Sequence, residues 1–318
     1  MPKVRIRRII SAMVRAYLSR FPWDKGKWRL WTLVHPYLGK DGFRPGTYRT
    51  KDGLKVRLDP ELYNNRFVYY WGVWEPDETR VIQTLLREGD VFLDVGANVG
   101  FFTLVAAQAV GDRGRVIAIE AVPPTAARLK ENVALNGFRN VSVYELAAMD
   151  GPGPVKIAKH GLQDRSGQHS LRFTGEDQPF WEVPGAAMDQ LPMAKEVAFI
   201  KMDIEGAEML ALKGLKKTLE RRRAPVILCE VTHSFLSDLG SSADELHRYL
   251  QDLDYRYQYD CHGGELTAYC HRAGSTEGFQ RNIVFSKTPL TTSRQAARGW
   301  GSQWLSWGRS LSKTRDGA

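Results

Sequence analysis

Residues 91–102, which read VFLDVGANVGFF, decide the fold of this chain. An apolar run of strand type leads into a glycine-containing turn and then into a helix-forming segment. Glu120 follows at the end of the next apolar run, RVIAIE. In a parallel sheet this layout places a nucleotide-type cofactor beyond the carboxyl ends of the strands.

The turn DVGANVG, residues 94–100, also indicates the kind of cofactor. A dinucleotide fold uses G-x-G-x-x-G, in which the second glycine lets the backbone approach a pyrophosphate. Asn98 stands in the place of that glycine, and Asp94 comes two residues before Gly96. The missing glycine disfavours a nicotinamide dehydrogenase, and the carboxylate favours a cofactor with a cationic amino-acid end. We therefore expect S-adenosylmethionine.

Outward from this turn, short apolar segments alternate with helical ones. Alternation of this kind predicts an α/β fold, a doubly wound and mostly parallel seven-stranded sheet. A polar, glycine-containing stretch at 150–187 interrupts the pattern. The expected strands are 91–95, 115–120, 141–147, 197–203, 226–231, 255–260 and 282–286, and the expected helices are 76–86, 100–110, 124–136, 206–220 and 242–253.

We expect three regions: an N-terminal helical and hairpin extension (1–75), the cofactor-binding domain (76–288) and a basic, tryptophan-containing tail (289–318). Residues 22–75 are rich in Trp, Tyr, Gly and Pro, and their pattern predicts irregular structure with a β-hairpin around the turn Lys51-Asp52-Gly53. Apolar residues at helical spacing predict an amphipathic helix at 4–21, and they are Ile6, Ile10, Met13, Val14, Tyr17, Leu18 and Phe21.

The charge of the chain is concentrated at its two ends. Of the formal net charge of +9, the first 22 residues carry +6 and the last 28 carry +4, so the residues between them carry −1. This distribution excludes a basic nucleic-acid surface on the body of the protein. The N-terminal helix either lies in a membrane interface or packs on the domain or on a second subunit. The tail, with Trp300, Trp304, Trp307 and Leu311, is either an interfacial helix or flexible.

The sequence favours a cytoplasmic protein, with peripheral membrane contact as an added hypothesis. No apolar run reaches the roughly 20 residues that span a bilayer, and no secretory signal begins the chain. Three cysteines in this length fit a reducing compartment.

A second motif, FIKMDIEGAEMLALKG, occupies residues 199–214. A strand ends at Asp203, and Gly206 opens a helix. Because the carboxyl ends of parallel strands meet at one edge of the sheet, acidic residues from several strands should gather there. The expected group is Asp94, Glu120, Asp203, Glu205, Glu230 and His233.

With these motifs the chain resembles the FkbM family of S-adenosylmethionine-dependent methyltransferases over about residues 70–286. The matching segments are GVWEPDET (72–79), VFLDVGANVGFFTL (91–104), AIE (118–120), AAMD (147–150), MDQL (188–191), IKMDIEGAEMLALKG (200–214), ILCEVTH (227–233) and NIVF (282–285). The residues after Glu120, Ala121-Val122-Pro123-Pro124, depart from the family, which usually has proline directly after the acid.

The resemblance implies a class I, Rossmann-like methyltransferase that methylates a hydroxyl of a sugar, glycolipid or secondary metabolite. Glu120 should accept the ribose hydroxyls, since a carboxylate offers two acceptor oxygens, and Ala148 should lie where the adenine packs. Carried over by position, the cofactor contacts are Asp94, Gly96, Ala97, Asn98, Gly100, Glu120, Ala148 and Asp203.

A hydroxyl acceptor must lose its proton, so the site needs a general base. His233 has the intrinsic pKa suited to that role; Asp203 is the competitor, and Glu205 is the third candidate. Asp203, Glu205 and Glu230 could also supply oxygen ligands to a divalent cation, but we predict no metal, because acidic clusters also orient substrates and cap helices. The pairs Cys261-His262 and Cys270-His271 match none of the common zinc spacings.

Two other functions remain as alternatives. The first is an N-methyltransferase that acts on a small-molecule or peptide amine. Many N-methyltransferases acting on amides carry [DN]-P-P-[YF] after the fourth strand, whereas this chain has Asp203-Ile204-Glu205-Gly206 there, which argues against that type. A non-catalytic scaffold with a degenerate cofactor site is disfavoured by the intact glycine turn and Glu120.

The loop at 160–172 either closes over the substrate or is a mobile insertion. We expect a small-molecule, glycan or lipid-linked acceptor and no nucleic acid; the acceptor itself and the oligomeric state stay open.

Overall fold

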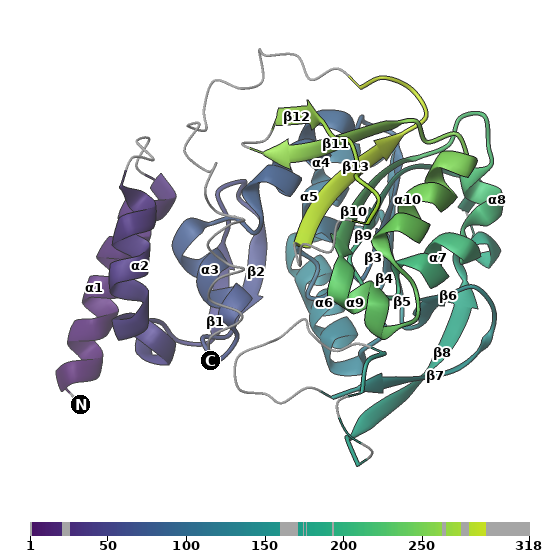
Figure 1. The fold of residues 1–318 in the computed structure, drawn as a ribbon. Helices are drawn as coiled ribbons and strands as arrows, with labels where there is room; N and C mark the ends of the chain where they lie inside the picture. The colour runs from purple at the N-terminus through teal and green to yellow at the C-terminus, as the bar shows by residue number, and fades with distance from the viewer. Residues whose placement is uncertain are drawn as a thin grey trace.

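The computed structural model describes residues 2–20, 26–159, 171–173, 175, 177–192, 194–262, 265–274 and 280–290 (Figure 1). Its centre is an eight-stranded sheet in the order β12-β11-β13-β10-β9-β3-β4-β5. The strands are β3 (Val91–Val95), β4 (Arg115–Ile119), β5 (Val141–Tyr144), β9 (Val197–Met202), β10 (Val226–Thr232), β11 (Tyr257–His262), β12 (Glu265–Ala268) and β13 (Gln280–Ser286).

The predicted doubly wound, mostly parallel sheet is confirmed. Strands β10, β9, β3, β4 and β5 are joined by parallel ladders, and β13 runs antiparallel to β10. The expected count of seven strands was one short, because β12 adds an antiparallel ladder to β11. Strand β3 has β4 on one side and β9 on the other, so the chain reverses its winding direction here. Ligands of such sheets bind at this switch point.

Two hydrophobic layers cover the sheet because its strands alternate their side chains. Phe92 packs into one layer with α4, α5 and α6, whereas Leu93 packs into the other with α7 and α10. The expected helix at 206–220 is divided at Leu215. The helices are α4 (Pro76–Leu85), α5 (Phe101–Val110), α6 (Pro123–Asn136), α7 (Glu208–Gly214), α8 (Lys216–Leu219), α9 (His233–Asp238) and α10 (Ala243–Asp252).

The stretch at 150–187, expected only to interrupt the pattern, carries most of a second sheet. Strands β6 (Ala147–Met149), β7 (Gly153–Ala158) and β8 (Phe180–Ala187) pair in the order β6-β8-β7 beneath the main sheet (Figure 1). The first half of β7 is largely exposed, so its hydrophobic alternation is weak. The strand that was expected at 141–147 ends at Tyr144, and Ala147 belongs to the second sheet.

The N-terminal extension contains more helix than its sequence suggests. The predicted first helix is confirmed as α1 (Pro2–Arg20), and the predicted hairpin is confirmed as β1 (Gly46–Arg49) with β2 (Lys55–Leu58). Helices α2 (Lys27–Leu38) and α3 (Tyr63–Trp71) replace the expected irregular structure. The sequence of α3, YNNRFVYYW, resembles a strand because it is aromatic, but its residues after Tyr63 are buried on every side. Short 3-10 turns lie at Gly39–Asp41, Met188–Gln190 and Ala194–Glu196.

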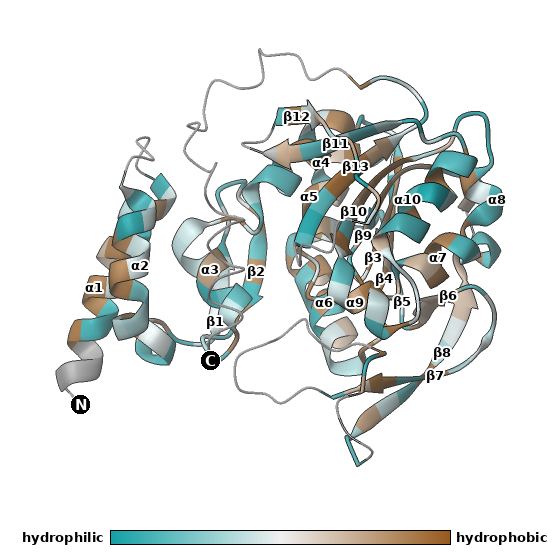
Figure 2. Ribbon diagram, in the orientation of Figure 1, coloured by the Kyte–Doolittle hydropathy of each residue, from teal (hydrophilic) through white to brown (hydrophobic). Residues whose placement is uncertain are grey.

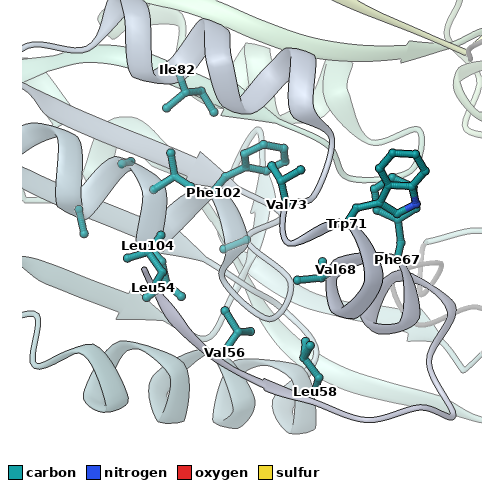
Figure 3. Close-up of a cluster of buried hydrophobic side chains, with 14 of the residues drawn as sticks. Leu54, Val56, Leu58, Phe67, Val68, Trp71, Val73, Ile82, Phe102 and Leu104 are labelled. Atoms are coloured by element: carbon teal, nitrogen blue, oxygen red, sulfur yellow. The ribbon is translucent and has the colours of Figure 1, made fainter. Parts of the chain in front are cut away.

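The extension shares one hydrophobic core with the sheet domain. Figure 3 shows Val56 of β2 and Trp71 of α3 in the same cluster as Ile82 of α4 and Phe102 of α5. The boundary expected near residue 75 therefore runs through a continuous core, and where the domains divide stays a prediction.

The apolar stripe expected on the first helix does not form a single face. Val14 and Leu18 are buried, whereas Ile6, Ile10 and Met13 are exposed. Phe21 of that stripe, the loop residues 160–170 and the tryptophans of the tail lie outside the described residues. No helix in the described part of the chain combines the length and apolarity needed to cross a membrane.

Candidate active site

The turn after β3 is pressed against the end of β9. Gly96 has φ +81°, and a Cβ atom built on it would lie 1.9 Å from the backbone oxygen of Asp203. The backbone N–H of Asp203 in turn donates to the oxygen of Val95 over 3.0 Å. Only glycine fits this approach, so Gly96 brings the two halves of the site together.

Glu120 ties the end of β4 to the same turn. Its Oε2 accepts the backbone N–H of Asn98 and its Oε1 that of Val122, each over 2.8 Å. Asn98 adopts φ 51°, a conformation that asparagine tolerates better than most residues. Burial raises the pKa of Glu120 to about 7, although the two amide bonds oppose the shift. Each carboxylate oxygen keeps a lone pair for a further donor.

Asp94 lies beneath the turn and does not line the pocket described below. Its side chain is fully buried, and its Oδ2 accepts the hydroxyl of Thr103 over 2.5 Å. Among the described residues, no donor reaches its Oδ1. Burial raises the pKa of Asp94 to about 6, against the opposing charge of Lys201. The structure thus gives Asp94 a supporting position, and its contact with a cofactor stays a prediction.

The segment after β9 forms a strained turn that Glu208 holds from within. Glu205 has φ 54° and Gly206 has φ 107°. The buried Glu208 accepts the backbone N–H groups of Ile204 over 3.1 Å and of Gly206 over 3.2 Å through its Oε1. Burial raises the pKa of Glu208 to about 7. Asp203 and Glu205 are thereby presented at the carboxyl end of the sheet.

Lys201 is a cation buried below the site. Only 2 % of its side chain is exposed, and its Nζ lies 2.8 Å from Oδ2 of Asp203. The same Nζ lies 4.9 Å from the centre of the Phe102 ring. Burial alone would lower the pKa of Lys201, but the charges of Asp203, Glu75 and Asp94 outweigh it and raise that pKa.

Glu230, which was expected at this edge of the sheet, and two carboxylates that were not expected, Glu75 and Glu78, interact electrostatically with this lysine. Burial and the charge of Asp203 raise the pKa of Glu230 to about 8. Burial also raises the pKa of Glu78 to about 7, and that side chain accepts Asn282 Nδ2 over 2.7 Å. Burial and the charge of Glu78 raise the pKa of Glu75. Sequence reasoning passed over Lys201, whose signal was a lone lysine within the apolar strand VAFIKM.

A pocket opens at the switch point between β3 and β9 and encloses about 740 Å³, part of it open to solvent. Its polar wall comes from the turn after β3 (residues 96–100), which we call the cofactor turn, and from the ends of β4 and β9. Six of the predicted site residues line it: Gly96, Asn98, Glu120, Ala148, Asp203 and Glu205. Its apolar wall was not foreseen, because it is built around the second sheet: Leu146, Met149, Ile157 and Leu171.

The other predicted site residues lie outside the pocket lining. Ala97 is buried, and a Cβ on Gly100 would lie 2.4 Å from Cδ1 of Leu129, so that glycine serves the packing of α6. His233 is the first residue of α9, and its Nδ1 is buried with no partner among the residues that the structure describes. The structure thus places Asp203 in the pocket lining and His233 outside it, and which of them acts as a base stays a prediction.

The described residues hold no group of three or more His, Cys, Asp or Glu side chains arranged to bind a metal. One member of each Cys-His pair has another partner. The Cys261 thiol donates to the oxygen of Asn282 over 3.4 Å, and His271 contacts Asp244 through its Nε2.

A glycine turn after the first strand of the parallel sheet and a carboxylate after the second are typical of Rossmann-like folds, and the family match makes this one a class I methyltransferase fold. The sequence profile of the family described as "Methyltransferase FkbM domain" matches residues 94–257, half of the chain. The chain belongs to this FkbM methyltransferase family.

The individual relatives match a smaller part of the chain or match it at low sequence identity. A protein-L-isoaspartate O-methyltransferase of Methanococcus aeolicus is 38% identical over 138 residues, 42% of this chain and 58% of that protein. Protein-L-isoaspartate O-methyltransferase 1 of Archaeoglobus fulgidus is 40% identical over 58 residues, 18% of this chain and 27% of that protein. The chain thus spans between a quarter and three fifths of these relatives. A solved S-adenosylmethionine-dependent O-methyltransferase from Thermotoga maritima has a TM-score of 0.40 and 16% identity, covering 79% of this chain and 80% of that one.

Proposed function

We propose that this protein is an S-adenosylmethionine-dependent O-methyltransferase that acts on a hydroxyl of a sugar, glycolipid or secondary metabolite. One observation carries the proposal. The carboxylate of Glu120, held by two backbone amides, lines the same pocket as Asp203 and Glu205 from the other side of the switch point. This arrangement supports a cofactor end and an acceptor end within one cavity.

The residues present fit this cofactor. Glu120 has acceptor capacity left for two hydroxyls, and the glycine at position 96 leaves no side chain between the turn and Asp203. Ala148 and Ile119 offer apolar surface to a flat ring. When bound, S-adenosylmethionine supplies an electrophilic methyl group. The protein's own part is to hold it close to an acceptor and to exclude water.

We assign the acceptor's proton to Asp203. Lys201 occupies Oδ2 of this carboxylate, which leaves Oδ1 to accept a proton from an alcohol in the pocket. Methyl transfer from a sulfonium otherwise needs mainly alignment, so one positioned base completes the required chemistry. Glu205 lines the pocket beside Asp203 and would orient the acceptor by accepting a second hydroxyl.

Calorimetric titration with S-adenosylmethionine and S-adenosylhomocysteine tests the cofactor assignment. We expect micromolar binding of both and a loss of at least about tenfold in Glu120→Ala, because a carboxylate accepting two hydroxyls contributes more than about 1.4 kcal/mol. Glu131→Ala, an exposed carboxylate on α6, is the matched control. No binding of either ligand to the folded protein would overturn the proposal.

A screen of hydroxylated glycans and lipids with radiolabelled cofactor tests the acceptor. The product should be a methyl ether, which survives alkali, whereas the methyl ester of a carboxyl acceptor would be hydrolysed. Asp203→Asn should lower the rate by about 10²–10⁴, and His233→Gln should change it much less. Equal losses in the two variants would return His233 to the role of base.

We also propose that the enzyme works in the cytoplasm. Cys229, Cys261 and Cys270 are all free thiols, as expected in a reducing compartment. Fractionation of the native cells tests this, and recovery of the protein outside the cytoplasmic membrane would contradict it.

A further inference from the structure

In the part of the chain that the structure describes, the exposed large apolar side chains lie mostly on one pair of helices. Among the described residues nine large hydrophobic side chains are exposed, and six of them belong to α1 and α2. We call this set the α1–α2 apolar surface: Ile6, Ile9, Ile10 and Met13 of α1, with Leu33 and Tyr37 of α2. Figure 2 shows hydrophobic segments on both helices at the edge of the molecule farthest from the main sheet.

This surface is separate from the face of α1 that holds the helix in place. Ser11 contacts the hydroxyl of Tyr70 over 2.8 Å, and Leu18 is fully buried. Arg15 donates to the backbone oxygen of Arg49, and its guanidinium lies 4.6 Å from the Tyr69 ring centre. The helix is therefore already anchored by one face, and its second apolar face is not needed for that packing.

The segment that carries this surface is basic in its sequence. Residues 1–38 contain nine Lys and Arg residues and a single acidic residue, Asp24. Within this segment lie Arg20, exposed in the last turn of α1, and Arg29, exposed on α2. Exposed apolar side chains flanked by arginines on the same helix are typical of helices that lie in a membrane interface.

We propose that the α1–α2 apolar surface docks on an anionic lipid membrane. The helices would lie in the headgroup region, with the isoleucines and Met13 inserted and the basic residues beside lipid phosphates and carboxylates. Charge decides between this occupant and a second copy of the chain. A two-fold interface would set the same positive segments against each other, and the C-terminal tail, which carries +4, is repelled as well.

Vesicle flotation with the full chain tests this inference independently of the proposed methyl transfer. Vesicles of phosphatidylcholine alone are compared with vesicles of phosphatidylcholine and phosphatidylserine. We expect binding to the second kind only, and weaker binding at high salt because screening reduces the attraction. Failure to bind anionic vesicles, or equal binding to both kinds, would overturn the proposal and leave the cofactor assignment untouched.

Three variants test whether the α1–α2 apolar surface makes the contact with the vesicles. Ile9→Glu with Met13→Glu should lower binding to the anionic vesicles by at least about tenfold, because two apolar side chains no longer insert. Leu33→Glu, on the other helix, should lower it as well, which guards against unfolding of α1 alone. Tyr257→Glu introduces the same charge at an exposed apolar position on β11 and should bind like the parent protein.

Sedimentation velocity of the same variants without lipid tests the competing occupant. We expect the parent protein and the Ile9→Glu, Met13→Glu variant to share one oligomeric state. An oligomer in the parent that the two substitutions dissociate would identify the surface as a subunit contact and overturn the lipid proposal. Unchanged vesicle binding in both helix variants would do the same.

Discussion

Nζ of Lys201 lies 2.8 Å from Oδ2 of Asp203, and this pair joins the buried interior of the sheet to the pocket. The lysine is almost fully buried, whereas a quarter of the Asp203 side chain is exposed. Lys201 also opposes the rise in pKa of Asp94 and Glu230. One cation therefore stabilises several carboxylates whose burial is otherwise unfavourable.

Replacing Lys201 by methionine should destabilise the protein by about 3–5 kcal/mol, because removal of one partner leaves buried charges uncompensated. The free energy of unfolding in urea measures this. The cost should be larger at pH 8 than at pH 6, since protonation of the carboxyls at lower pH relieves part of the repulsion. Lys213→Met removes an exposed lysine that lies 3.9 Å from Glu245 and should change stability by less than about 0.5 kcal/mol. Similar values for the two variants would contradict the role of Lys201.

Gly96→Ala should abolish cofactor binding and destabilise the turn after β3. The new Cβ would lie 1.9 Å from the backbone oxygen of Asp203, in addition to the cost of a positive φ. Gly89→Ala separates the two effects, because Gly89 has φ +92° with no atom within 4 Å of the added Cβ. We expect about 1–2 kcal/mol for Gly89→Ala and at least about 2 kcal/mol more for Gly96→Ala. Equal costs in thermal or urea unfolding would show that the turn relaxes freely.

Glu208 gives the protein a pH dependence of defined sign. Its pKa is raised from 4.5 to about 7 in the folded state, so the native state binds this proton more tightly than the unfolded chain does. The contribution to stability is therefore lost as pH rises from about 4.5 through about 7.

Glu208→Gln should flatten the pH dependence of the free energy of unfolding between pH 5 and 8 by at most about 3 kcal/mol. The amide oxygen can still accept from Ile204 and Gly206, so the turn should keep its shape. Urea unfolding across this range is the measurement, and the exposed Glu131→Gln is the control. A variant with the full slope of the parent protein would assign the dependence to other carboxyls, such as Glu120 and Glu230.

The sequence predicted the main sheet well because its strands are buried and flanked by helices. Apolar runs such as VFLDV have few other structures available to them, and Gly96 and Glu120 mark where these strands end. The second sheet was missed because half of β7 faces solvent and lacks that signal. Helix α3 was missed for the opposite reason, since its burial on every side after Tyr63 leaves no exposed polar face by which a helix is recognised.

The candidate site was predictable where a residue follows directly after a strand, as Asp203 and Glu120 do. The position of a residue directly after a strand did not reveal whether that residue lines the pocket. His233 follows β10 in the same way, yet it does not line the pocket. The apolar wall could not be found from the sequence, because Ile157 reaches the pocket through the pairing of the second sheet, and Leu171 packs against the hydrophobic cluster that contains Ile157.

Asn132 of α6 connects the N-terminal hairpin to the cofactor turn. Its Nδ2 donates to the oxygen of Val99 over 2.7 Å, and its Oδ1 accepts the backbone N–H of Arg57 over 2.8 Å. Asn136, one helical turn later, makes a similar pair of bonds to Lys55 of the same strand, but none of its described bonds reaches the cofactor turn.

Asn132→Ala and Asn136→Ala should therefore both lower the free energy of unfolding, by about 1–3 kcal/mol for each buried group left without a partner. Only Asn132→Ala should also weaken S-adenosylhomocysteine binding in calorimetry, because Val99 lies between Asn98 and Gly100 in the turn that lines the pocket. Equal affinities in the two variants would show that the turn keeps its shape without the bonds of Asn132. A loss confined to Asn132→Ala would show that the turn depends on this one side chain, which also accepts a hydrogen bond from Arg57 of the hairpin.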